Sequence, residues 1–142
     1  MYGKSSLVGL VTGTIAGLAS ITPASGWVSP VEAMIIGGIA GILCQIICEV
    51  IKGFFQIDDT LDVFAVHGIG GVFGTIMLAI FGYAGWSEQL GSLLIVGIFT
   101  IVATYLIVKF VMLFCPIRVS EENELTGLDQ SSHGERAYDM AS

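Results

Sequence analysis

Four long apolar runs dominate this sequence and limit what it can fold into. They cover residues 6–21, 31–55, 61–82 and 90–114. A helix needs about 20 mainly apolar residues to cross a bilayer, and these runs are close to that length. Charged residues make up only 12% of the chain, about half their usual share in a soluble domain. We therefore predict an all-α fold, a polytopic bundle of four transmembrane helices in a lipid bilayer.

Two regions differ in composition, a membrane region over residues 1–116 and a tail over residues 117–142. From Glu121 onward the tail carries six acidic residues and a single basic one, Arg136. Few apolar residues accompany them, so the tail is expected to be a solvated extension and not a fifth span. Its negative charge argues against nucleic acid as a partner.

The basic residues around the spans lie at one end of the expected bundle. The two loops at the other end, residues 22–30 and 83–89, contain no lysine or arginine. The positive-inside rule places the basic residues and the tail in the cytoplasm, with the protein in a plasma or inner membrane. These basic residues are Lys4, Lys52, Lys109 and Arg118.

Small residues recur four positions apart in the first three runs. This spacing lets helix backbones approach closely where lipid offers no hydrophobic drive, so we expect these three helices to pack tightly. The fourth run is bulky on every side and is expected to be a peripheral helix that faces lipid. The small residues include Gly9, Gly13 and Gly17, then Ala33, Gly37 and Gly41, then Gly70, Gly71 and Gly74.

A histidine stands inside the third run, five residues after the acid that opens it. Ionisable groups at membrane depth are costly and usually line a pathway, so His67 is a candidate pore residue. A neutral imidazole offers one hydrogen-bond donor and one acceptor, which suits the passage of a small polar species. The alternative is a core histidine that is hydrogen-bonded to a neighbouring helix.

Three carboxylates, Asp58, Asp59 and Asp62, stand at the mouth of the same run. They can cap the third helix, where the helix dipole favours negative charge. They can equally form a vestibule that attracts cations, and the two roles are compatible. Glu49 lies three residues before Lys52 at the end of the second run, a spacing that predicts an ion pair.

Nothing in the sequence indicates an enzyme. Asp62 and His67 are five residues apart, about 140° around a helix, and therefore do not share a face. Cys44 and Cys48 are two thiols on an apolar helix and Cys115 lies far along the chain, which is too few ligands for a metal site. We expect no catalytic residue, no metal and no cofactor.

The run DDTLDVFAVHGIGG at residues 58–71 resembles the signature of the ammonium transporter (Amt/MEP/Rh) family, most closely its Amt branch. GTIAGL at 13–18, ITPASG at 21–26 and GLDQSSHGERAY at 127–138 extend the resemblance. It implies an eleven-span fold, built from two inverted five-helix repeats and a last peripheral helix, that assembles as a homotrimer. The chain then corresponds to the carboxyl-terminal part, spans eight to eleven plus the tail.

The resemblance also implies a function for individual residues. Ammonium or ammonia would be the substrate, and His67 would be the second of two pore histidines, with Val63 on the same wall. Asp62 would lie at the cytoplasmic end of that helix, and Thr12 and Thr22 near the inner and outer parts of the pore. The first pore histidine belongs to spans that this chain does not contain.

The tail motif implies regulation. Family tails contact neighbouring subunits and, in many prokaryotes, accommodate a PII-type signalling protein. The alternative function for this chain is accordingly a non-conducting regulatory or assembly module derived from a transporter. The tail residues carried by the motif are Gly127, Asp129, Ser131, His133, Gly134 and Tyr138.

Overall fold

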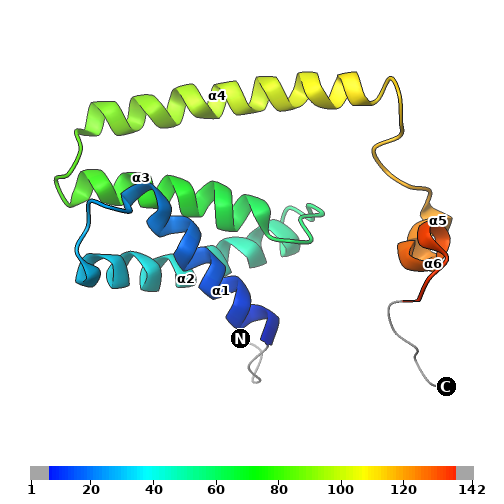
Figure 1. The fold of residues 1–142 in the computed structure, drawn as a ribbon, viewed down its shortest axis with the longest axis horizontal. Coiled ribbons are helices and arrows are strands. Elements are labelled where there is room, and N and C mark those ends of the chain that lie inside the picture. Colours follow the sequence, from blue (N-terminus) through cyan, green and yellow to red (C-terminus); the bar gives the residue numbers. More distant parts are fainter. Residues whose placement is uncertain (1–6, 137–142) are drawn as a thin grey trace. The chain divides into compact units, whose positions relative to one another are not determined.

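A computed structural model describes residues 7–136, and over that range the chain is helical and contains no strand (Figure 1). This confirms the predicted all-α class. The chain forms two compact units, Met1–Val96 and Gly97–Ser142, and one long helix crosses the boundary between them. Lys4 and Tyr138, on which parts of the sequence-based interpretation depend, lie outside the described residues.

The first two long helices are α1 (Leu7–Ile21) and α2 (Pro30–Gly53), with a short 3-10 turn, η1 (Thr22–Ala24), after α1. The α2 helix begins at Pro30 because Ser29 and Glu32 form a capping box. The Ser29 hydroxyl accepts the Glu32 N–H at 3.4 Å, and the Glu32 carboxylate accepts the Ser29 N–H at 2.7 Å. Pro30, which has no N–H to satisfy, suits the first helical position.

The third helical segment is shorter than its apolar run. It consists of a π-helical turn, η2 (Phe64–Ile69), continued by α3 (Gly70–Ile80). Asp62 adopts a left-handed backbone with φ of 56°, which delays the helix start, and Gly82 with φ of 80° follows its end. The result is an apolar helix of 17 residues, where the sequence predicted a span over residues 61–82.

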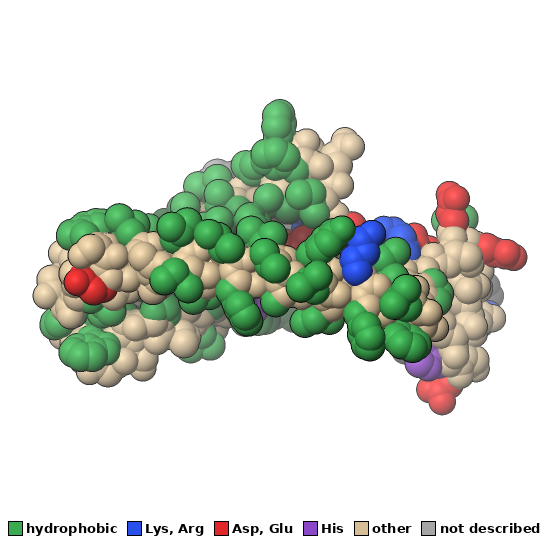
Figure 2. Space-filling model, turned by 90° about the horizontal axis from the view of Figure 1, so that it is seen from above, with side chains coloured by type: hydrophobic (Ala, Val, Ile, Leu, Met, Phe, Trp, Pro, Cys, Tyr) green, Lys and Arg blue, Asp and Glu red, His purple; other side chains and the backbone are tan. Residues whose placement is uncertain are grey.

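The last long helix is α4 (Trp86–Val111), which begins four residues before the apolar run predicted it and ends three residues earlier. Its first turn contains Glu88, and an acid is favourable there because of the helix dipole. None of its residues is buried. Figure 2 shows hydrophobic side chains spread over much of the visible surface. Among residues 7–136, three helical stretches are long and apolar enough to cross a membrane: Leu7–Ala24, Pro30–Gly53 and Trp86–Val111.

Within the first unit, glycines bring α1 against α2. A Cβ added at Gly17 would lie 3.6 Å from the Gly37 Cα, and one added at Gly41 would lie 3.8 Å from the Gly13 carbonyl oxygen. These pairs match the predicted small-residue rows. The backbones therefore approach to ordinary van der Waals contact, which provides packing without a hydrophobic drive.

The contact between α1 and α3 is closer still. A Cβ at Gly74 would overlap the Ser20 carbonyl oxygen, and one at Gly70 would lie 2.8 Å from the Ser20 hydroxyl. Ser20 is completely buried, and its hydroxyl has no hydrogen-bond partner among the described residues.

Two small hydrophobic clusters hold α1, α2 and the third segment together. One lies around the π turn and the other near the η1 end of the unit. Their members are mostly small, so the helices are close and the core is thin. The first contains Ala16, Cys44, Cys48, Ala65 and Val66, and the second contains Ala24, Ile36, Met77 and Leu78.

In the second unit, the predicted solvated tail contains two short helices, α5 (Glu121–Thr126) and α6 (Leu128–His133). Arg118 donates two hydrogen bonds to the Glu124 carboxylate, at 2.7 and 3.0 Å. Gly127, with φ of 93°, forms the junction between the two helices. The described tail residues are exposed or half-buried, so this is an ordered but solvated segment.

Candidate functional site

His67 lies in the π-helical turn η2 and is exposed on the surface of the first unit. The N–H of Gly70 bonds to the carbonyl of Ala65, five residues back, which is the π-helical pattern. Ala65 and Val66 point into the core, whereas His67 and Gly68 are exposed. Such turns insert one extra residue into a helix and are frequent at functional sites because they redirect side chains.

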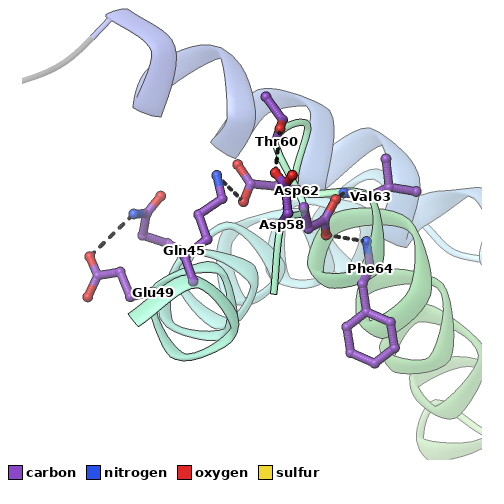
Figure 3. A network of polar contacts seen from close by, with 9 residues as sticks. Gln45, Glu49, Asp58, Thr60, Asp62, Val63 and Phe64 are labelled. Atoms are coloured by element: carbon purple, nitrogen blue, oxygen red, sulfur yellow. Dashed lines mark hydrogen bonds and ion pairs between the residues drawn. The ribbon is translucent and has the colours of Figure 1, made fainter. Parts of the chain in front are cut away.

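The three acids at the mouth of this helix are used in different ways (Figure 3). The Asp59 carboxylate accepts the N–H groups of Val63 and Phe64, both at 2.9 Å, and so caps the first turn. The Asp58 carboxylate accepts a hydrogen bond from the Thr60 hydroxyl at 3.1 Å.

Asp62 bonds across to another helix. The Lys52 ammonium lies 2.8 Å from the Asp62 carboxylate, and the Asp62 side chain is only 15% exposed. The partner that the sequence pattern indicated for Lys52 was Glu49, which instead accepts a hydrogen bond from the Gln45 amide at 3.4 Å. The Lys52–Asp62 pair joins the last turn of α2 to a loop residue two positions before the third helical segment.

The two threonines proposed for the pore lie in different places. Thr12 lines an open hollow of about 360 Å³ together with Thr60, Leu61 and Asp62. Thr22 lies in η1 and its hydroxyl donates to the Leu18 carbonyl at 2.8 Å, a bond back to the last turn of α1. The structure therefore places Thr12 beside Asp62, whereas Thr22 lies ten residues later in the chain, after the end of α1.

Val63 lines a second, larger hollow of about 650 Å³, whose rim includes Asp58 and Asp59. Phe64 lines the same hollow, although its sequence position alone did not single it out. His67 is not among the residues that line either hollow. It lies one turn beyond Val63, on the exposed side of η2.

A further contact links the loop after α3 to the start of α2. The Tyr83 hydroxyl donates a hydrogen bond to the Glu32 carboxylate at 3.1 Å. This hydrogen bond, together with burial and the negative charge of Glu32, raises the pKa of Tyr83 above its ordinary value near 10. Because the partners are 51 residues apart, no local sequence pattern indicates the pairing.

The predicted tail residues that the structure describes belong to α6 and its ends. Asp129 is in the first turn of α6, and His133 is its last residue, followed by Gly134 in the left-handed conformation. The Ser131 hydroxyl donates to the Asn123 carbonyl at 3.5 Å and so connects α6 to α5. Over the described part of the chain, no group of three or more His, Cys, Asp or Glu side chains is arranged to hold a metal ion.

The family model described as the Ammonium Transporter Family matches residues 1–138. The chain belongs to this family. Among its relatives are an ammonium transporter of Bacillus subtilis, 38% identical over 95% of the chain, and the ammonium transporter Amt1 of Archaeoglobus fulgidus, 38% identical over 96%. This member of the ammonium transporter family spans 37% and 38% of the length of those two proteins. No solved structure gives a significant match.

Proposed function

We propose that this chain is the carboxyl-terminal portion of an ammonium transporter of the Amt branch, and that His67 lines its conduction path. One observation carries the proposal. In a chain of this family, a redirected turn of an apolar helix presents its histidine outward and buries the two residues before it. An imidazole at membrane depth needs a hydrogen-bonding partner, and a passing ammonium or ammonia can be that partner.

The chemistry of His67 suits that role. Neutral imidazole accepts one hydrogen bond and donates another, so it can bond to ammonia or take part in moving its proton. It carries no fixed charge that would hold a cation permanently. Val63, one turn earlier on the exposed side of the helix, provides an apolar neighbour along the same wall.

The acids and threonines extend this path. In the proposal, Thr12 and Asp62 line a vestibule at the cytoplasmic exit, and the hollow that they share supports this placement. Asp58 and Asp59 contribute negative charge to the same mouth, where cations are attracted. Thr22 is proposed for the outer end of the path, at the other end of α1 from Thr12.

Assembly and regulation are proposed from the family resemblance. The complete protein would form a homotrimer with its carboxyl terminus in the cytoplasm, and the tail would meet a PII-type signalling protein. An alternative is that the chain is a non-conducting regulatory or assembly module. The ordered α5–α6 segment, held to Arg118 by two hydrogen bonds, is the observation in favour of a regulatory role.

Uptake of labelled methylammonium by the complete transporter tests the role of His67. We expect His67→Ala to reduce uptake by about tenfold or more, a barrier increase of roughly 1.4 kcal/mol. Thr14→Ala is the matched control, because its hydroxyl bonds back to the Leu10 carbonyl at 3.0 Å within its own helix. Uptake that is unchanged in His67→Ala, in amount and in selectivity, would refute the pore role.

A further inference from the structure

Asp62, two residues before the third helical segment, has an unusual backbone. Asp62 has φ of 56°, a left-handed conformation that costs energy for any residue with a side chain and is tolerated best by Asn and Asp. Such a conformation persists only where surrounding contacts hold it. Two contacts hold it here: the Asp62 N–H donates to the Asp59 carbonyl at 3.2 Å, and the Asp62 carboxylate pairs with the Lys52 ammonium at 2.8 Å, at the end of α2.

Asp62 also starts the hydrogen-bonding of the helix. Its carbonyl accepts the N–H of Val66 at 2.8 Å, and Val66 is the residue immediately before His67. A rotation of the Asp62 backbone would therefore remove the first acceptor of the turn that carries the histidine. The conformation of Asp62 and the direction of His67 are mechanically connected through this bond.

Other contacts hold the start and the buried side of the π turn, but they do not set the direction of the His67 side chain. Asp59 caps Val63 and Phe64, and Ala65 and Val66 are packed against α1 and α2. The π turn then fits one extra residue between this anchored start and Gly70. The register of that extra residue depends on where the first carbonyl acceptor is held.

We propose that Lys52 is a positioning residue for His67. By pairing with Asp62, it holds the left-handed backbone that starts the π turn, and so it sets the direction in which the side chain at position 67 is presented. The importance of that direction for transport rests on the proposed function. The positioning itself does not, and it can be measured separately.

Thiol labelling measures the presentation of position 67 directly. The complete transporter carries His67→Cys, with the native cysteines replaced by serine, and reacts in membranes with methanethiosulfonate ethylammonium. We expect Lys52→Met to change the labelling rate by about fivefold or more, equivalent to a shift of roughly 1 kcal/mol. Lys52→Arg keeps the positive charge and should restore the parent rate.

Three controls separate positioning from general damage. Lys109→Met removes a lysine that lies over the Tyr105 ring, and Glu49→Gln removes the charge three residues from Lys52; neither should alter the rate. A cysteine introduced at Ser92 on α4 should react at the same rate in the parent and in Lys52→Met. A misfolded variant would change that rate as well. Where Lys52→Met fails to fold, Asp62→Asn removes the pair while retaining a residue that tolerates a left-handed backbone.

The outcomes distinguish the two proposals. An unchanged labelling rate in folded Lys52→Met or Asp62→Asn would refute positioning by the ion pair, as would a failure of Lys52→Arg to restore the rate. A changed and restored rate supports it. Methylammonium uptake that is insensitive to His67→Ala would refute the pore role of His67 and leave the labelling result standing.

Discussion

Asp59 and Asp62 are three residues apart and stabilise the same turn by different means. Asp59 acts locally, because its carboxylate accepts hydrogen bonds from two backbone N–H groups at the helix start. Asp62 acts from a second helix, through Lys52. A local bond and a tertiary bond therefore converge on the residues just before His67, which is the part of the third helix that departs from α-helical geometry.

The cap at Asp59 gives a prediction for stability. Asp59→Ala leaves the N–H groups of Val63 and Phe64 without their acceptor, and we expect a loss of about 1–2 kcal/mol in unfolding free energy. Hydrogen exchange at those two amides should quicken in the variant, measured in detergent by mass spectrometry. Glu49→Ala, which removes an exposed carboxylate from α2, is the control, and equal exchange in both variants would argue against a capping role.

Two glycine contacts between helices differ in how much space they leave. At Gly17 an added methyl group would reach ordinary contact distance from the Gly37 backbone, so the helices have a little room. At Gly74 the same methyl group would overlap the Ser20 carbonyl, which is backbone and cannot turn aside. The α1–α3 contact is therefore the tighter one, and Gly74 lies five residues beyond the end of the π turn.

That difference predicts which glycine substitution disrupts the bundle. Gly74→Ala forces α1 and α3 apart, and we expect it to cost about 2 kcal/mol or more. Gly71→Ala, whose added methyl group meets nothing within 4 Å, is the matched control and should stay close to the parent. Thermal unfolding in detergent distinguishes the two, and equal melting temperatures would contradict the packing described for α3.

The link between Tyr83 and Glu32 predicts a dependence on alkaline pH. The folded state raises the pKa of Tyr83, so its stabilising effect is complete below the ordinary value near 10 and is lost as pH rises through the folded value. Glu32→Gln should move the Tyr83 pKa back towards 10, while glutamine can still complete the capping box. Ultraviolet titration of tyrosinate, with the other tyrosines replaced by phenylalanine, measures this, and identical titrations would exclude the link.

Across the whole chain, the apolar spans and the acidic tail are distinct in composition and in structure. The spans carry exposed hydrophobic side chains and thin cores of small residues, as suits helices in contact with lipid or with further helices. The tail is built from local elements, a serine cap at Ser120, a glycine junction and an arginine–glutamate pair. These contacts all lie within the tail itself.

Removal of the tail tests the regulatory hypothesis. Truncation of the complete transporter before Glu121 should change methylammonium uptake by about fivefold or more, the lower end of common coupling free energies. Arg118→Gln breaks the bidentate pair and should reproduce part of the effect, because α5 then loses its anchor. Uptake that matches the parent without the tail would reject regulation through it.

Much of the architecture was accessible from the sequence because it depends on local patterns. Apolar run length predicted helices, and glycines four apart predicted the rows in contact between α1 and α2. The ends of elements were less accessible. The sequence placed the third helix from residue 61 because Leu61 is apolar, but the left-handed backbone at Asp62 delays its start.

The sequence by itself determined the helical class, the membrane-like character of the chain and its family, because these follow from hydropathy, spacing and motif. Only the tertiary structure decided how the residues of the candidate site are used. It paired Lys52 with Asp62 and not with Glu49, and it inserted the π turn that exposes His67. The ion pair and the π turn both depend on the position of the end of α2 relative to the third helix. That position is a distance in space, and it cannot be predicted from residue spacing along the chain.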